Sequence, residues 1–159
     1  MPRSLWVLAL GNFAVGTSGL VLAGILGLLA ADLDVPLGTA GTVITAYALT
    51  YAVSAVLLSG VTGHLPRRTL LIAGLGLFTL GNVAAAVAPS FGVLLLARAV
   101  SAVGASVFTP VASGVAAALV PPELRGRALA LVFVGIPVAT ALGVPLGTWT
   151  VSYTHLRAH

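Results

Sequence analysis

One arginine lies deep inside a long apolar segment of this chain. Arg98 is the only charged residue in the run 91–119. A central arginine in a membrane helix costs about 2.5–3.5 kcal/mol on insertion scales, so polar groups are needed to compensate it. At helical spacing the stripe of Arg98 continues through Ser101, Ala105 and Thr109, which predicts that Arg98 faces a polar interior. The alternative is an arginine near the outer helix end whose long side chain snorkels to the membrane surface.

Hydroxyl groups mark one side of another apolar run, 39–60. At helical spacing, one face of that run holds Tyr47, Thr50, Tyr51 and Ser54. A polar face on a membrane helix usually looks into a helix bundle or a wet cavity. The run 70–88 has few polar side chains, chiefly Thr79 and Asn82, which suits a lipid-facing helix. The candidate residues of a substrate pathway are therefore Asn12, Tyr47, Tyr51, Arg98, Ser101 and Thr109.

The remaining reactive side chains do not form a catalytic or metal-binding pattern. The chain has no cysteine, and its three histidines, at positions 64, 155 and 159, are widely scattered. The three carboxylates, Asp32, Asp34 and Glu123, all fall in predicted turns, and no nucleophile and base stand at a suggestive spacing. The sequence therefore predicts no enzyme, no metal site and no cofactor. The arginines occur in isolated pairs between apolar runs rather than along one face, which excludes nucleic acid as a partner.

The composition is that of a membrane protein. Hydrophobic residues make up 59% of the 159 residues and charged residues only 6%, whereas soluble domains carry about 25% charged residues. The mean hydropathy is +1.16. A spanning helix needs about 20 mostly apolar residues, and five runs are long enough: Leu5–Ala30, Thr39–Gly60, Leu70–Ala88, Phe91–Leu119 and Ala128–Thr150. The first run exceeds the apolar core of a signal peptide, so we expect a retained first helix.

The arginines between these runs predict an orientation. They lie in the N-terminal stub and in the second and fourth turns, at Arg3, Arg67, Arg68, Arg125 and Arg127. The first and third turns contain no lysine or arginine. Since alternate turns lie on the same side of a bilayer, the positive-inside rule places the N-terminus in the cytoplasm. We therefore expect a multi-pass protein of the cell membrane.

Several short motifs follow one another along the chain: Leu65-Pro-Arg-Arg-Thr-Leu, Ala88-Pro-Ser-Phe, Ala97-Arg98, Val120-Pro-Pro-Glu-Leu-Arg-Gly-Arg-Ala128 and Gly143-Val-Pro-Leu-Gly-Thr-Trp149. In this order and spacing they resemble the drug-efflux and sugar-efflux proton antiporters of the major facilitator superfamily. The resemblance covers nearly all of residues 1–150. It implies an all-α membrane fold of twelve helices in two six-helix halves, each built from inverted repeats of three helices. This chain would supply about five helices of the N-terminal half.

The resemblance also implies roles for particular residues. A loop that gates the cytoplasmic side matches Gly60, Arg67 and Arg68, with His64 near the place of the usual aspartate. The arginine motif of the fourth helix matches Arg98 and, more loosely, Gly104. The antiporter motif of the fifth helix matches a further set, with its usual Gly-Pro order altered: Gly135, Gly143, Pro145 and Gly147.

Two features of the chain depart from that family. Many members carry a membrane carboxylate in the first helix for proton coupling, whereas the run Gly16–Leu20 here contains no acid. Proton coupling must then use a residue outside this chain, or be absent. The second departure is the polar tail 151–159, which differs from the usual continuation. We expect residues 1–150 to belong to the transporter domain and the tail to be non-native read-through after a truncation, the alternative being a divergent outer loop.

The sequence thus favours small-molecule transport, here as a truncated fragment of a secondary efflux antiporter. The expected partners are the lipid bilayer, a drug, sugar or other amphiphile as substrate, and protons as a candidate coupling ion. The alternative is a membrane scaffold without transport activity, which would use its glycine-rich faces to bind other helices. A membrane enzyme is the least favoured of the three, for want of catalytic residues.

Overall fold

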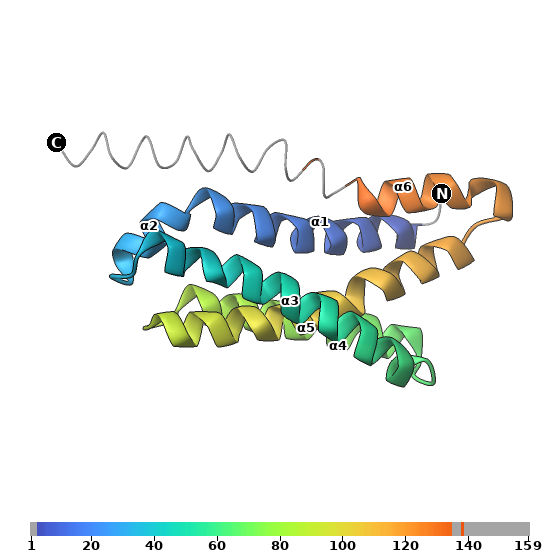
Figure 1. Cartoon of the computed structure of the whole chain (residues 1–159). Helices are drawn as coiled ribbons and strands as arrows, with labels where there is room; N and C mark the ends of the chain where they lie inside the picture. Colours follow the sequence, from blue (N-terminus) through green and yellow to red (C-terminus); the bar gives the residue numbers. More distant parts are fainter. Residues whose placement is uncertain (1–2, 135–137, 139–159) are drawn as a thin grey trace.

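The computed structural model describes residues 3–134 and 138, and within them it contains α-helices, one 3₁₀ turn and no strand. The all-α fold class expected from the sequence is confirmed. The elements are α1 (Arg3–Gly24), α2 (Leu26–Asp32), α3 (Leu37–Thr62), α4 (Arg67–Ala86), α5 (Phe91–Ala118), the 3₁₀ turn η1 (Pro122–Leu124) and α6 (Arg125–Phe133). The helices run up and down along one long axis, and their turns gather at two ends (Figure 1).

Four described helices, α1, α3, α4 and α5, are long and apolar enough to cross a bilayer. They correspond to the first four predicted spans. Their ends differ from the predicted ones by up to three residues, except at the end of the first span. The fifth predicted span begins within α6, and most of it lies outside the described residues. So do the tail 151–159 and the expected antiporter motif Gly135, Gly143, Pro145 and Gly147.

The first predicted span is not one straight helix. It divides into α1 and α2 at Ile25, yet the backbone bonds from Ile25 N to Val21 O (3.1 Å) and from Leu29 N to Ile25 O (2.9 Å) carry the helical pattern across the break. Gly24 and Gly27 flank this position, and glycine is a common cause of a helix bend. Hydropathy measures only the length of an apolar run, so it could not register the bend.

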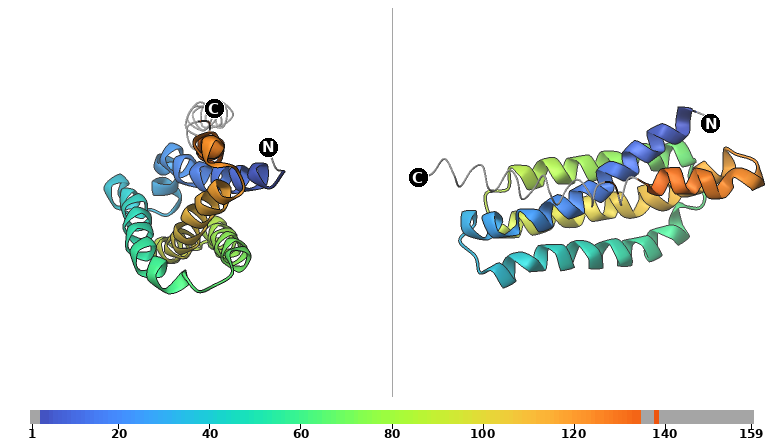
Figure 2. Two further views of the ribbon diagram at one scale, coloured as in Figure 1. Left: turned by 90° about the vertical axis from the view of Figure 1, so that its right-hand side faces the viewer. Right: turned by 90° about the horizontal axis from the view of Figure 1, so that it is seen from above.

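Short turns separate the spans and fix where each helix begins. Pro36 and Pro66 directly precede α3 and α4. The Ser90 side chain caps α5 by accepting a hydrogen bond from Val93 N at 3.5 Å. Asp34 has a positive φ of 49°, a conformation that aspartate tolerates better than most residues. Viewed from above and from one end, the start of α1 lies at the same end as the α3–α4 and α5–α6 turns (Figure 2).

The closest helix contact joins α4 to α5, so α4, whose run 70–88 suited a lipid-facing helix, also has a protein-facing side. One face of α4, formed by Leu70, Gly74, Phe78 and Gly81, is buried. A Cβ atom on Gly81 would lie 2.5 Å from Ser101 N, and one on Gly104 would lie 2.5 Å from Gly74 O. Small residues let membrane helices pack this closely. The apolar side chains of α4 gave no sign of this because protein-facing and lipid-facing positions share the same hydropathy.

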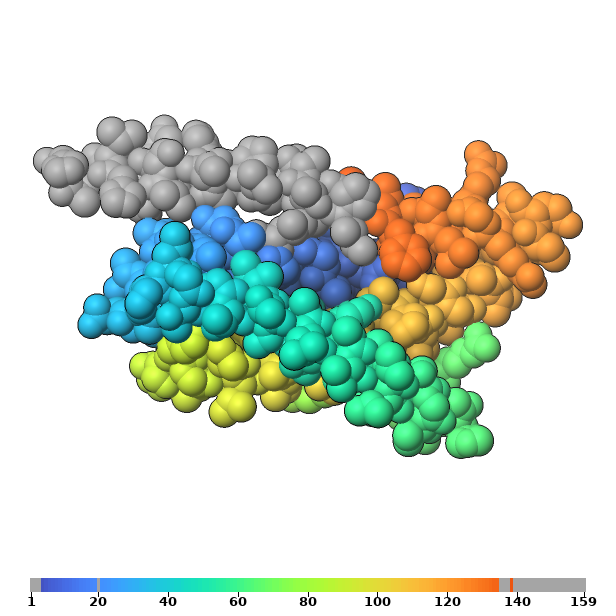
Figure 3. Space-filling view, viewed as in Figure 1, coloured from blue at the N-terminus to red at the C-terminus, as the bar shows by residue number. Residues whose placement is uncertain are grey.

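The buried apolar side chains form two clusters, one toward each end of the bundle. The cluster near the N-terminus joins α1, α5 and α6 through Leu5, Leu8, Phe108, Ala112, Ala116, Val120, Ala128 and Val132. The cluster at the opposite end is smaller and contains Leu22, Val43 and Leu94. By contrast, much of α3 is exposed, with Val56 74% accessible, and α3 crosses the face of the molecule seen in Figure 3.

The α4–α5 contact predicts the effect of a single methyl group. Gly104→Ala should lower the free energy of unfolding by about 1–3 kcal/mol, because overpacking forces the two backbones apart. Thermal unfolding of the purified protein in detergent would measure this. Gly76→Ala is the matched control on α4, because its Cβ would meet nothing within 4 Å. Equal melting temperatures for the two variants would contradict the close packing described here.

Candidate substrate site

Arg98 is buried in the bundle, with only 3% of its surface exposed. Its Nη1 donates to Ser18 Oγ at 2.7 Å and to Asn82 Oδ1 at 3.2 Å. Its Nη2 makes a longer bond of 3.5 Å to the Ser18 carbonyl. The side chain therefore does not snorkel to a surface within the described structure. It reaches from α5 to oxygens on α1 and α4.

An aromatic ring covers one face of the guanidinium. The centroid of Tyr47, on α3, lies 4.5 Å from Arg98 Cζ, which is within the range of a cation–π contact. Four helices thus meet at this one cation. Two buried polar atoms in the cluster have no hydrogen-bond partner, namely Arg98 Nε and the Tyr47 hydroxyl.

The sequence did not identify Ser18 and Asn82 as members of this cluster. Ser18 Oγ donates to Asn82 Oδ1 at 2.7 Å, and Asn82 Nδ2 in turn donates to the Phe78 carbonyl at 2.8 Å. A signal was present for Asn82, because an amide inside a membrane span tends to seek a partner on another helix. No comparable signal marked Ser18, since a serine can bond within its own helix.

Two other predicted pathway residues, Asn12 and Thr109, meet in a separate polar contact. Thr109 Oγ1 donates to Asn12 Oδ1 at 3.0 Å, and Asn12 Nδ2 donates to the Val132 carbonyl at 3.2 Å. Asn12 is fully buried. The contact ties α1, α5 and α6 together, and both atoms of the amide side chain are satisfied. The structure therefore gives these two residues a joining role and does not bring them to Arg98.

The remaining pathway residues lie on different sides of the bundle. Tyr51 is half-buried one turn after Tyr47, on the α3 face that the sequence predicted to be polar. Ser101 is fully buried between α5 and α4, where its hydroxyl bonds the Arg98 carbonyl at 2.8 Å. In this structure Ser101 therefore lies in the contact between the two helices, and its place in a substrate pathway stays a prediction. A hydroxyl that bonds its own helix can pack against a neighbouring helix as a small residue.

A cavity of about 640 Å³ reaches the Arg98 cluster from one side. Its polar residues are Thr17, Ser18, Asn82 and Arg98, and most of the other lining is apolar, including Leu22, Ile25, Leu29 and Leu94. The cavity therefore joins a buried charge to an apolar surface. Such a combination suits an amphiphilic molecule, because a few polar groups orient a ligand that apolar walls surround.

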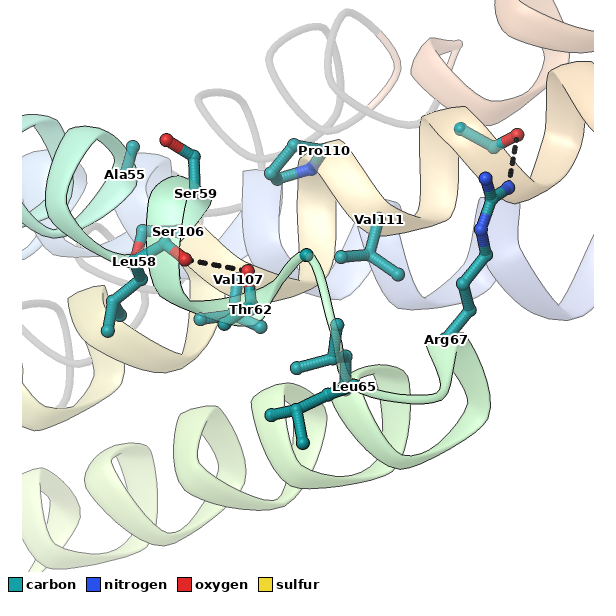
Figure 4. A pocket seen from close by; sticks show the side chains of 13 residues that line it. Ala55, Leu58, Ser59, Thr62, Leu65, Arg67, Ser106, Val107, Pro110 and Val111 are labelled. Carbon is teal, nitrogen blue, oxygen red and sulfur yellow. Dashed lines mark hydrogen bonds between the residues drawn. The ribbon is translucent and has the colours of Figure 1, made fainter.

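A second cavity, of about 340 Å³, lies between the end of α3 and the middle of α5 (Figure 4). Arg67 reaches across its edge and donates from Nη1 to the Gly114 carbonyl at 3.3 Å. Pro110 also lines this cavity and sits inside α5, where it removes one backbone hydrogen bond. The other residues of the expected gating loop, Gly60 and Arg68, are exposed at the same end, as is His64.

The described residues contain no group of three histidine, aspartate or glutamate side chains that could hold a metal ion. The site offers hydrogen-bond donors, hydroxyls, an aromatic face and one fixed positive charge. Groups of this kind are suited to binding and orienting a molecule, and among the described residues none is arranged as a nucleophile with its base.

The sequence over residues 8–158 matches the family model of the Major Facilitator Superfamily. The chain therefore belongs to this superfamily of membrane transporters. It is 42% identical over 146 residues to an uncharacterized transporter of this type from Bacillus subtilis, covering 92% of this chain and 37% of that protein. It is 42% identical over 153 residues to a chloramphenicol resistance protein of Streptomyces lividans, covering 94% and 39%.

A chloramphenicol efflux pump of Mycobacterium tuberculosis is 36% identical over 146 residues, covering 92% of this chain and 35% of the pump. The chain thus spans little more than a third of the length of these relatives. Together with the apolar helices, the family membership identifies a multi-pass membrane protein.

The geometry around Arg98 predicts that lysine cannot replace it. The compact ammonium group of lysine cannot both cover the Tyr47 ring and reproduce the hydrogen bonds of the guanidinium to Ser18 and Asn82. Arg98→Lys should lower the free energy of unfolding by about 1.5–3 kcal/mol, the usual range for hydrogen bonds to a charged group. Arg125→Lys, at an exposed position, is the control and should change little. Matching melting curves for both variants in detergent would contradict the buried cluster.

Proposed function

We propose that this chain forms most of the N-terminal half of a secondary transporter that exports small amphiphilic molecules. The observation that carries the proposal is the polar cluster at Arg98, which lies inside an apolar bundle and borders a cavity. Buried charges within membrane spans commonly mark substrate or ion pathways. The names of two relatives support efflux, since one is a chloramphenicol resistance protein and the other a chloramphenicol efflux pump.

The transport cycle needs two halves that rock around a site near the membrane midplane. The relatives are more than twice as long as this chain, which supports residues 1–150 as one part of a longer transporter. Antiport with protons would use a carboxylate outside this chain, because the chain's only acids, Asp32, Asp34 and Glu123, stand outside its membrane spans.

We further propose that the N-terminus lies in the cytoplasm of a cell-membrane protein. The turns that carry Arg67, Arg68, Arg125 and Arg127 lie at the same end as the start of α1 (Figure 1). Asp32 and Asp34 lie in the α2–α3 region at the opposite end. At the cytoplasmic end, the bond from Arg67 to Gly114 ties the gating loop to α5 beyond Pro110. A change in that bond would accompany opening and closing of the cytoplasmic side.

The orientation predicts the behaviour of reporter fusions. A reporter joined after Pro122 should be active only as a cytoplasmic protein, and one joined after Pro36 only as an external protein, because the positive-inside rule retains the arginine-bearing turns. Paired alkaline phosphatase and fluorescent-protein fusions in bacterial cells would measure both positions. The opposite pattern at the two sites would overturn the proposed topology.

The transport proposal predicts different activities for the whole transporter and for this chain. In liposomes, the full-length parent protein should move chloramphenicol across the membrane, whereas residues 1–159 alone should not, because they cannot alternate around a midplane site. Uptake of labelled chloramphenicol would be compared after equal insertion of both proteins is verified. Transport by residues 1–159 alone would refute the requirement for two halves, and an inactive parent would refute chloramphenicol-like efflux.

A further inference from the structure

Among the described residues, the positive charge of Arg98 has no negative partner. Its hydrogen-bond acceptors are a hydroxyl, a side-chain amide and a backbone carbonyl, all of them neutral. The chain has only three acidic residues, and Asp32, Asp34 and Glu123 are all exposed in the turns at the ends of the bundle. An arginine remains protonated in proteins, so it cannot escape burial by losing its charge. A buried cation of this kind strongly favours an anion beside it.

One edge of the Arg98 guanidinium is short of hydrogen-bond acceptors among the described residues. Nη1 is occupied by Ser18 and Asn82, whereas Nε has no acceptor although it is buried. Nη2 makes only its long bond of 3.5 Å to the Ser18 carbonyl. Nε and Nη2 together form the side fork of an arginine, whose two parallel donors match the two oxygens of a carboxylate. The Tyr47 ring lies against the same guanidinium, with its centroid 4.5 Å from Cζ.

We propose that Arg98 binds the carboxylate of the transported molecule, so that the substrate class includes amphiphilic monoanions. This inference rests on the proposed efflux function and narrows its substrate. The cavity beside Arg98 has room for an organic anion and is lined mainly by apolar side chains. A carboxylate on an apolar body therefore fits the site better than a sugar, which needs many polar partners.

The test uses the full-length parent protein in liposomes and two probes that differ by one methyl group, which removes the negative charge. They are chloramphenicol hemisuccinate, which carries a carboxylate, and the methyl ester of that hemisuccinate, which is neutral. Each competes against transport of labelled chloramphenicol. We expect the carboxylate probe to compete about tenfold better or more, as follows from the strength of charge-assisted hydrogen bonds.

A nearly isosteric variant provides the counter-charge from inside the protein. Asn82→Asp would place a carboxylate where Asn82 Oδ1 now lies, 3.2 Å from Arg98 Nη1. With that internal ion pair the two probes should compete about equally, because the charge of Arg98 is then already neutralised. Thr39→Asp is the control. It adds the same charge at an exposed position in the first turn of α3 and should keep the preference of the unmodified protein.

The outcomes separate this inference from the proposed function. Chloramphenicol transport without preference for the carboxylate probe would overturn the inference and leave efflux standing. A preference that persists in Asn82→Asp would also overturn it, since the anion would then bind elsewhere. A preference seen in phosphatidylcholine vesicles but lost when phosphatidylglycerol is added would identify a lipid headgroup as the natural anion and overturn the substrate assignment. If Asn82→Asp does not fold, the probe pair on the unmodified protein decides alone.

Discussion

The burial of one positive charge in an apolar bundle is the constraint on which the rest of this structure depends. Arg98 is almost fully buried, so its donors must find acceptors on other helices. Ser18 brings α1 to it, Asn82 brings α4, and Tyr47 covers it from α3. Hydrophobic association alone would leave these helices free to rotate in lipid, because lipid tails are as apolar as leucine. The arginine thereby fixes which face each helix presents.

The close packing of α4 on α5 makes that arrangement attainable. Gly81 directly precedes Asn82, and its missing side chain lets α4 rest against the backbone at Ala97 and Ser101. Asn82 is therefore held one position beyond the tightest contact, with its amide near Arg98. Larger residues at Gly81 or Gly104 would separate the two backbones and lengthen the bonds to the cation. Packing and polar recognition thus depend on the same few small residues.

The sequence predicted the parts of this structure that depend on one helix at a time. Apolar length located four spans, and helical spacing identified the half-buried face around Tyr47 and Tyr51 as well as the isolated charge of Arg98. It did not predict the partners of Arg98. To identify Ser18 and Asn82 as its partners, one must know how α1, α4 and α5 are rotated and at what depth each lies relative to the others. Ser101 shows the same limit. It shares a stripe with Arg98, but the long arginine side chain leaves that stripe while the serine stays in the helix contact.

The features of α5 are ordered along the helix in a way that separates binding from movement. Arg98 and Gly104 lie before Pro110, in the part of the helix that packs tightly on α4. Gly114, which accepts the bond from Arg67, lies after it. Since Pro110 cannot donate to the carbonyl one turn earlier, the helix is most easily bent at that point. A bend there would shift the end of α5 that contains Gly114 relative to the α3–α4 loop and leave the contacts of Arg98 unchanged. In the proposed transport cycle, the cluster at Arg98 can therefore stay rigid while the end of the bundle near Arg67 changes shape.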